Sequence, residues 1–394
     1  MEEIVIVAAA RTAIGDFGGF FKSLLCNQML VPVIKEVMAR AGLEGSEIDD
    51  VIIGCCAQNS AEPNLGRTAT LLAGLPKEVT GMTIQRQCSS GMQAMVSGCQ
   101  QIATGDSEIV IAGGAESMST VPYSLKGARW GQRLQHGQMT DSLWELLTDP
   151  IHQILMGETA ERLADKYGIS REEQDIVALR SHQNAIRAID QGFFKEETIP
   201  ISIPQRKGEP LLVDTDEHPR RDITMDKLAK LAPTFRKNGT VTAGNSSGLN
   251  DGAAAVVLMK AGRAEKMGLK PLGRIAGFAR AGVEPDLMGY GPVPAIKKAL
   301  QRAGRSLAEM ELIELNEAFA AQYLACEKLL DLNREITNVN GSGVGLGHPV
   351  GCTGARISTT LLYEMKRRNL RWGLASMCVG GGMGMAMVFE RERD

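Results

Sequence analysis

Short apolar runs rich in β-branched residues recur along the chain, and helical stripes lie between them. The runs cover residues 4–9, 50–55, 108–113, 311–315, 374–379 and 383–389, and each predicts a buried strand. In the first helical stripe, apolar residues follow one another at helical spacing from Leu30 to Met38, and Gly42 closes it. A second helix is predicted over residues 295–304. The alternation predicts a layered α/β fold.

The pattern changes over residues 118–247, which are more polar and less regular. A capping box from Ser170 to Glu173 predicts a helix that runs to Gly192 inside this segment. Long irregular segments in compact chains are usually functional, so we interpret it as an inserted lid or loop domain rather than as surface loops alone. The predicted division is residues 1–117 plus 248–270, residues 118–247, and residues 271–394. Residues 48–55 and 310–317 resemble each other weakly, which suggests an internal repeat.

Cys88 lies where a strand-like run ends at Gln87 and a helical pattern with Met92, Val96 and Cys99 begins. Unpaired N–H groups and the helix dipole at a helix N-terminus favour a thiolate, the form of cysteine that acts as a nucleophile. The simpler interpretation is a buried cysteine that fills a gap, and for an isolated cysteine it would be preferred.

Three further motifs favour the nucleophile. Asn316 opens Asn-Glu-Ala-Phe-Ala, His348 lies in the glycine-rich residues 340–356, and Cys378 opens Cys-Val-Gly-Gly-Gly-Met-Gly. Together with the residues around Cys88, these motifs closely resemble the thiolase family over nearly the whole chain. The resemblance implies a five-layered α-β-α-β-α sandwich of two similar halves. It also implies cleavage of 3-ketoacyl-CoA, or condensation of two acetyl-CoA to acetoacetyl-CoA, by ping-pong acyl transfer.

The resemblance also implies roles for individual residues. Cys88 carries the acyl group, His348 accepts a proton from Cys88 or from coenzyme A (CoA), and Cys378 moves the proton at C2 of the acetyl unit. The N–H groups of Gly380 and Cys88 form one oxyanion hole, and a water oriented by Asn316 forms the other with His348. Each of these residues also has a simpler interpretation when it is taken singly. His348 could be a buried histidine in a turn, Cys378 a packed thiol, and Asn316 a cap at the end of a strand. Next to the asparagine, a structural role is expected for Glu317.

Four residues match family positions that contact CoA. Ser247 matches a serine at the pantetheine, Arg220 an arginine beside the adenine, and Leu147 and Met156 match positions that line the pantetheine and acyl pockets. Ordinary core packing is a serious alternative for the last two. Leu155 departs from the histidine of many biosynthetic thiolases, which puts one CoA contact in doubt. The motifs leave the preferred acyl chain length open, because some resemble thiolases specific for short chains and others resemble thiolases with a broader range.

Composition and charge limit the partners, metal sites and cellular location that can be expected. The 394 residues carry a net charge of −3, which gives no electrostatic reason to expect nucleic acid or an anionic membrane as partner. No pair of the eight cysteines has C-x-x-C spacing, so no metal site is expected, and Cys352 is interpreted as a packing residue. No apolar run reaches membrane-spanning length, and free thiols suit a cytoplasmic location. We expect no permanently bound cofactor, with CoA and acyl-CoA as substrates.

Two other functions remain open. A ketosynthase-like condensing enzyme of the same superfamily usually lacks the terminal cysteine, so Cys378 argues against it. A catalytically silent CoA- or lipid-binding protein would be expected to have lost one of the reactive residues. A redox switch between Cys88 and Cys378 would add to the enzymatic function. The family resemblance implies a homodimer or homotetramer, with residues 130–136 as candidate tetramer contacts.

Overall fold

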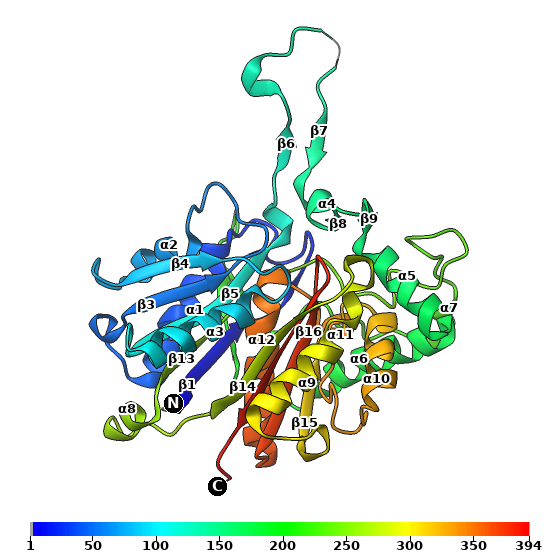
Figure 1. Cartoon of the computed structure of the whole chain (residues 1–394). Helices are drawn as coiled ribbons and strands as arrows, with labels where there is room; N and C mark the ends of the chain where they lie inside the picture. Colours follow the sequence, from blue (N-terminus) through cyan, green and yellow to red (C-terminus); the bar gives the residue numbers. More distant parts are fainter. Residues whose placement is uncertain (1–2, 135, 394) are drawn as a thin grey trace.

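The computed structural model describes residues 3–134 and 136–393, and most of its strands join one large mixed sheet (Figure 1). Within these residues the sheet follows the order β15-β16-β17-β14-β1-β13-β5-β3-β4, with β10 paired to β1 and β2 to β13. Its strands are β1 Ile4–Thr12, β2 Gly15–Asp16, β3 Asp50–Gly54, β4 Thr80–Ile84, β5 Ile109–Ser117, β10 Thr198–Ile199, β13 Asn250–Lys260, β14 Gly273–Gly282, β15 Leu312–Leu315, β16 Trp372–Val379 and β17 Met383–Glu390.

The helices cover both faces of this sheet and its centre. They are α1 Cys26–Ala41, α2 Leu65–Leu72, α3 Ser90–Thr104, α4 Ser142–Leu146, α5 Met156–Tyr167, α6 Arg171–Asp190, α7 Met225–Ala229, α8 Ala261–Lys266, α9 Pro292–Ala303, α10 Ala320–Leu330, α11 Gly343–Leu346 and α12 Val350–Arg368. Shorter ribbons pair β6 Tyr123–Leu125 with β7 Met139–Asp141, β8 Thr148–Asp149 with β9 Ile154–Leu155, and β11 Ile201–Ile203 with β12 Leu211–Val213.

Three large apolar clusters fill the spaces between five layers of helices and strands. One lies between α1 and α2 and the strands β1, β3, β5 and β13, and another between α9 and α10 and the strands β14 to β17. The third surrounds α3 and α12, which fill the centre between the two groups of strands (Figure 1). Along β3, Val51 and Ile53 face the outer cluster and Ile52 the central one, as expected for a strand buried on both faces. The predicted five-layered α/β fold is confirmed.

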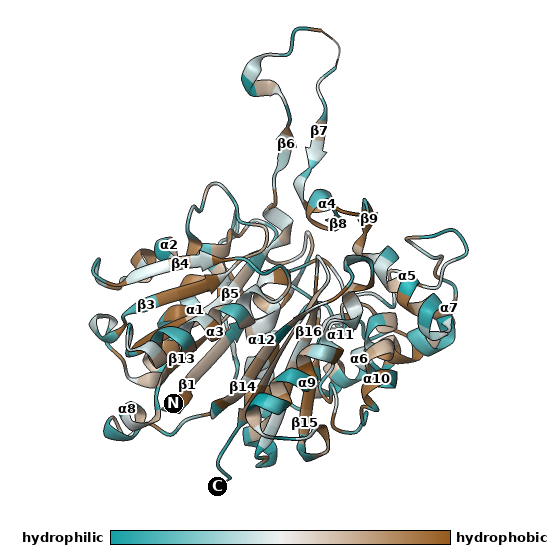
Figure 2. Ribbon diagram, viewed as in Figure 1, coloured by the Kyte–Doolittle hydropathy of each residue, from teal (hydrophilic) through white to brown (hydrophobic). Residues whose placement is uncertain are grey.

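The two groups of strands meet along a short seam, because β1 and β14 pair only at Val5 with Arg274 and at Ile6 with Gly273. The weak repeat seen in the sequence is real in structure. In each half, a 3₁₀ turn with a capping box precedes a parallel strand: η1 Gly45–Glu47 leads into β3, and η5 Leu307–Glu309 leads into β15. Figure 2 shows the hydrophobic residues concentrated in the strands and the hydrophilic ones on outer helices such as α7 and α9.

Several predicted boundaries need correction. The strand expected at residues 108–113 runs to Ser117, because its pairing with β13 continues to that residue. The helix that begins at the Ser170 capping box ends at Asp190, two residues before Gly192. The inserted segment is more regular than predicted, since it contains helix α5 in addition to the predicted helix α6.

The ribbon formed by β6 and β7 extends away from the body of the protein (Figure 1). Large apolar side chains on it face solvent, with Trp130 85% exposed and Leu134 86% exposed. Of the candidate tetramer contacts at residues 130–136, Gln135 lies outside the described residues. Within the part of the chain that the structure describes, no helix is both long enough and apolar enough to cross a membrane.

Candidate active site

Cys88 lies in a tight turn between β4 and α3. The preceding Gln87 adopts a left-handed backbone conformation with φ of 44°. The Ser90 hydroxyl accepts the Arg86 N–H at 2.8 Å and donates to the Gln87 carbonyl at 2.6 Å. The Ser89 hydroxyl donates to the Arg86 carbonyl at 3.0 Å. These local hydrogen bonds hold a conformation that is uncommon outside glycine and present the thiol of Cys88 to a pocket.

The predicted net shift of the Cys88 pKa is wrong in sign, because burial outweighs the main-chain N–H groups. The helix begins at Ser90, with Ser89 as its N-cap, so Cys88 precedes the first turn. Burial raises the pKa of the Cys88 thiol above its ordinary value, and the nearby Glu116 charge adds to this. The N–H groups of Gly380 and of Cys88 itself act in the opposite direction but do not prevail. Cys88 is therefore a neutral thiol that needs a base.

His348 is held by a turn that only glycine permits at its entry. Gly347 has φ of 99°, and a Cβ there would lie 2.6 Å from the side chain of Asn250. The Asn250 side-chain oxygen accepts the His348 N–H at 2.8 Å. The imidazole Nδ1 lies 2.6 Å from the Thr353 hydroxyl, and that hydroxyl donates to the Pro349 carbonyl at 2.9 Å. With that hydrogen directed at the carbonyl, the hydroxyl oxygen is free to accept a hydrogen from Nδ1, and in this tautomer Nε2 carries the free lone pair.

Burial, followed by the positive charge of Arg356, lowers the pKa of His348 to about 3. The imidazole is therefore neutral near pH 7, and in this buried site it is a weaker base than a free imidazole. Beside it, the Asn316 side-chain nitrogen lies 3.4 Å from Nδ1, and the Asn316 amide oxygen has no hydrogen-bond partner among the described residues. Glu317 is buried and accepts hydrogen bonds from Ser181 and from Asn338, the latter at 2.8 Å, which agrees with its predicted structural role.

Cys378 and Gly380 approach Cys88 from the end of β16. Cys378 is fully buried, and burial raises its pKa well above the ordinary value. The Gly380 N–H interacts with the sulfur of Cys88. A Cβ built on Gly380 would lie 3.7 Å from the Met156 sulfur and 3.8 Å from the Gln87 side chain, so this loop lies between the pocket wall and the Cys88 turn.

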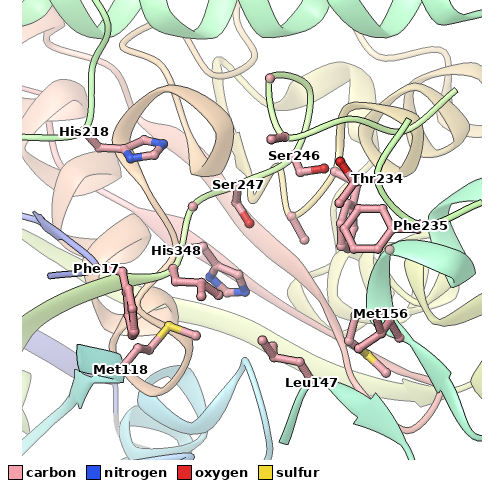
Figure 3. A pocket seen from close by; sticks show the side chains of 18 of the residues that line it. Phe17, Met118, Leu147, Met156, His218, Thr234, Phe235, Ser246, Ser247 and His348 are labelled. Atoms are coloured by element: carbon pink, nitrogen blue, oxygen red, sulfur yellow. The ribbon is translucent and has the colours of Figure 1, made fainter. Parts of the chain in front are cut away.

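One pocket of about 780 Å³ joins most of the predicted residues (Figure 3). The pocket is lined by Cys88, His348, Ser247, Arg220, Leu147 and Met156, whereas Cys378, Asn316 and Gly380 are not among its lining residues. Figure 3 shows Ser247 and His348 with their polar atoms directed into the pocket, and Leu147, Met156 and Phe235 on its apolar sides. Leu147 and Met156 are neighbours, because the Met156 N–H donates to the Leu147 carbonyl at 2.9 Å across the β8–β9 ribbon.

The sequence did not single out several residues that shape this site. Asn250 and Thr353 hold His348, and both lie inside glycine-rich motifs that could have drawn attention to them. Met118, Phe235 and Phe319 line the pocket with ordinary apolar side chains, for which no sequence signal exists. Cys352 packs against Ala254 and Ala355, as predicted. The described residues contain no cluster of histidine, cysteine and carboxylate ligands able to hold a metal ion.

Comparison with known families decides the identity. Residues 4–262 match the N-terminal domain of thiolase and residues 269–391 match its C-terminal domain. The chain belongs to the thiolase family. It is 49% identical to an acetyl-CoA acetyltransferase of Pseudomonas aeruginosa over 393 residues, covering 100% of both chains. It is 48% identical to the beta-ketothiolase BktB of Cupriavidus necator, covering 99% of both.

Solved thiolase structures agree with the fold. An acetyl-CoA acetyltransferase of Bacillus anthracis superposes with a TM-score of 0.98 at 57% identity, covering 99% of each chain. Human mitochondrial 3-ketoacyl-CoA thiolase superposes with a TM-score of 0.96 at 43% identity, also covering 99% of each chain. The human enzyme has also been solved in complex with CoA, and that structure has a TM-score of 0.95 at 43% identity, covering 99% of this thiolase and 98% of the human chain.

Proposed function

We propose that this thiolase transfers acyl groups between CoA thioesters through an acyl-enzyme on Cys88. It would cleave a 3-ketoacyl-CoA with CoA, or condense two acetyl-CoA to acetoacetyl-CoA in the reverse direction. The observation that carries the proposal is that Cys88 and His348 line the same pocket, with the Gly380 N–H directed at the sulfur. A nucleophile, a neutral base and a main-chain donor are what acyl transfer requires.

In the first half-reaction His348 takes the proton of the Cys88 thiol, and the sulfur attacks the 3-keto carbon. The C2–C3 bond then breaks, the acyl group stays on Cys88, and the departing acetyl-CoA enolate takes a proton at C2 from Cys378. The raised pKa of Cys378 supports this role, because a thiol that stays protonated is available as a donor. The imidazolium of His348 then passes its proton to the Cys378 thiolate, which restores a neutral base and a neutral thiol. In the second half-reaction His348 deprotonates CoA, whose sulfur attacks the thioester. The C–S bond to Cys88 breaks, the shortened acyl-CoA leaves, and the Cys88 thiolate takes the proton back from His348.

Two oxyanions form during this cycle, and each needs donors. We assign one hole to the N–H groups of Gly380 and Cys88, supported by their interaction with the Cys88 sulfur. We assign the other to His348 together with a water oriented by Asn316. The buried Asn316 amide oxygen without a hydrogen-bond partner among the described residues supports this assignment, because such an oxygen is costly unless a ligand or water satisfies it.

CoA would enter along the same pocket as a substrate, with no permanently bound cofactor. Ser247, Leu147 and Met156 are proposed to contact the pantetheine and the acyl chain, and Arg220 the adenine. Their place in the pocket lining supports this, as does the exposure of Arg220. Leu155 also lines the pocket, so the contact made by histidine in many biosynthetic thiolases would be replaced by an apolar one.

We also propose the division into residues 1–117 plus 248–270, 118–247 and 271–394, with the middle segment serving as the lid over the pocket. A homodimer or homotetramer in the cytoplasm, acting in fatty acid metabolism, completes the proposal. The exposed apolar side chains on the β6–β7 ribbon support assembly, because a projecting ribbon of this composition is unfavourable in water. Light scattering of the purified protein would measure its mass, and a mass equal to one chain would contradict assembly.

The experiment that tests the function is thiolysis by purified protein, with Cys88→Ala as control. CoA would be supplied with acetoacetyl-CoA, 3-ketohexanoyl-CoA and 3-ketodecanoyl-CoA, and kcat/KM compared. A strong preference for acetoacetyl-CoA indicates a short acyl pocket and a role in acetoacetyl-CoA metabolism. Comparable rates on the longer chains indicate β-oxidation. A folded protein without activity on any of them would overturn the proposal in favour of a silent CoA- or lipid-binding protein.

A further inference from the structure

Glu116 is a buried carboxyl group near the end of β5 whose two oxygens accept hydrogen bonds from both halves of the protein. Oε2 accepts the N–H of Cys56 at 2.9 Å and the N–H of Gly351 at 2.7 Å. Oε1 accepts the N–H of Ala57 at 3.0 Å, and the thiol of Cys55 donates to it at 3.5 Å. The carboxyl group thus ties the end of β3 to the start of α12.

The partners of Glu116 fix its charge. Three of the four groups that reach its oxygens are main-chain N–H groups, which can only donate, so a proton on the carboxyl group would weaken their hydrogen bonds. Burial raises the pKa of Glu116 above its ordinary value, and the N–H groups of Ala57, Cys56 and Gly351 oppose this shift without reversing it. The arrangement fits an ionised carboxylate, and hydrogen bonds to a carboxylate are stronger than those between neutral groups.

The N–H that Glu116 holds lies three residues after His348. Gly351 is the second residue of α12, and a Cβ there would lie 2.7 Å from Glu116 Oε2 and 2.8 Å from the Cys55 Cα. The start of α12 is therefore pressed against the other half at this carboxylate. Asn250 holds the N–H of His348 itself, so the turn from His348 to Gly351 is fastened at both ends.

Resting on the proposed thiolase reaction, we propose that Glu116 is a positioning residue that sets the place of His348 relative to Cys88. Glu116 forms no hydrogen bond with the side chain of Cys88 or of His348. It acts through the Gly351 N–H on one side and through the end of the strand at Cys56 on the other. A displacement of about 1 Å between reacting groups can lower a rate roughly a hundredfold. Holding two segments from opposite halves with one rigid, charged acceptor limits such displacement.

Glu62 offers a matched control, because it is also a buried carboxylate that accepts two main-chain N–H groups. It holds the N–H of Cys26 at 3.0 Å and of Asn27 at 2.7 Å at the start of α1, in an outer layer. We expect Glu116→Gln to lower kcat for thiolysis by roughly ten- to a hundredfold with KM nearly unchanged. We expect Glu62→Gln to lower the melting temperature similarly and to leave kcat nearly unchanged. Equal losses of kcat in both variants would overturn the proposal.

Alkylation of Cys88 by iodoacetamide, followed by mass spectrometry, provides a second readout that does not require turnover. With His348 present, Glu116→Gln should slow alkylation relative to its effect in a His348→Ala background, because a displaced imidazole no longer accepts the thiol proton. Loss of the Glu116 charge also lowers the pKa of Cys88, and that effect is common to both backgrounds. In a His348→Ala background the same substitution should cause no slowing. Equal slowing in both backgrounds, or none in either, would contradict positioning through His348. If Glu116→Gln fails to fold, Glu116→Asp, which keeps the charge and shortens the reach, carries the same comparison with a smaller expected effect.

The two tests separate this inference from the proposed function. A wild-type protein without thiolysis of any 3-ketoacyl-CoA would overturn the function, whereas the alkylation comparison would still report whether Glu116 acts through His348. Active wild-type protein with an unaffected Glu116→Gln variant would overturn only the inference.

Discussion

The two central helices begin side by side, and a reactive residue precedes each by two positions. Cys88 comes two residues before α3, which begins at Ser90, and His348 comes two residues before α12, which begins at Val350. The helices touch closely, since a Cβ on Gly354 would lie 2.4 Å from the Met92 nitrogen. The two turns are thus equivalent in position but differ in what holds them.

The Cys88 turn is held by its own neighbours, because Ser89 and Ser90 bond to the backbone three and four residues back. The His348 turn is held mainly from far along the chain. Asn250 is 98 residues from His348, and Glu116 is 235 residues from Gly351. The nucleophile is therefore shaped by local sequence and the base by tertiary structure. This contrast predicts which substitutions near the site damage chemistry and which damage folding.

The largest effect is expected for Cys88→Ser, which leaves the local turn intact and removes the nucleophile. Loss of a covalent nucleophile lowers kcat by about 10⁴-fold or more. The variant should unfold at nearly the wild-type temperature, because the serine hydrogen bonds that shape the turn remain. Thiolysis and thermal unfolding measured on the same preparation check both parts. Substantial turnover by the variant would show that the acyl group is carried elsewhere.

His348→Asn should cost somewhat less, because it removes the base and leaves the nucleophile. General acid–base catalysis contributes about 10²–10⁴-fold, and we expect kcat to fall within that range. Both half-reactions should slow, since His348 is proposed to deprotonate Cys88 in the first and CoA in the second. Rapid-quench measurement of acyl-enzyme formation and of its consumption by CoA separates the two. A loss confined to one half-reaction would contradict the shared role.

The contrast between local and distant anchoring predicts that Asn250→Ala is more harmful than Ser90→Ala. Asn250 accepts the His348 N–H and donates to the Gly15 carbonyl at 3.1 Å, so its loss leaves buried groups unpaired. We expect about 2–3 kcal/mol less stability and a clear loss of kcat, against about 1 kcal/mol for Ser90→Ala. Urea unfolding and thiolysis of both variants provide the comparison. Equal effects would show that the two turns are held with similar strength.

Acidification should weaken the fold through its buried histidines. The pKa values of His348 and His182 are lowered to about 3, mainly by burial, from 6.5 when unfolded. The unfolded chain binds more protons below pH 6.5, so this stability is present above that pH and lost as the pH falls towards 3. At pH 5 each histidine has lowered the free energy of unfolding by about 2 kcal/mol relative to neutral pH. His348→Asn should reduce the loss between pH 7.5 and 5.0 by that amount, and an unchanged loss would contradict the assignment.

Much of this organisation could be predicted from the sequence, because it is written in local patterns. Hydrophobic periodicity located six of the long strands, β1, β3, β5, β15, β16 and β17, and the helices α1, α3 and α9, and the capping box located the start of α6. The strands β13 and β14 and the helices α2, α10 and α12 were not predicted. The Cys88 turn was recognisable because glycine and serine surround it. The predicted strand and helix types held where segments were strongly patterned, and errors fell at their ends, as at Ser117 and Asp190.

What could not be predicted depends on groups that only the fold brings together. Local sequence placed Cys88 near a helix N-terminus and suggested a stabilised thiolate, whereas burial in the folded protein raises its pKa. Glu116 appeared in the sequence as a polar residue after a strand, and its partners at Cys56 and Gly351 are visible only in three dimensions. The anchors of His348 were missed for the same reason.

The smallest effect is expected for Cys56→Ala, which tests how self-sufficient the Cys88 turn is. The Cys56 thiol donates to the Gln87 side-chain oxygen at 3.2 Å, linking the turn to the end of β3. Because Ser90 already fixes the Gln87 backbone, removing the thiol should cost about 1 kcal/mol of stability and leave kcat nearly unchanged. Cys99→Ala, at a buried thiol of α3, controls for loss of a sulfur alone. A fall in kcat of more than about tenfold for Cys56→Ala and not for Cys99→Ala would mean that the nucleophile, like the base, depends on a distant anchor.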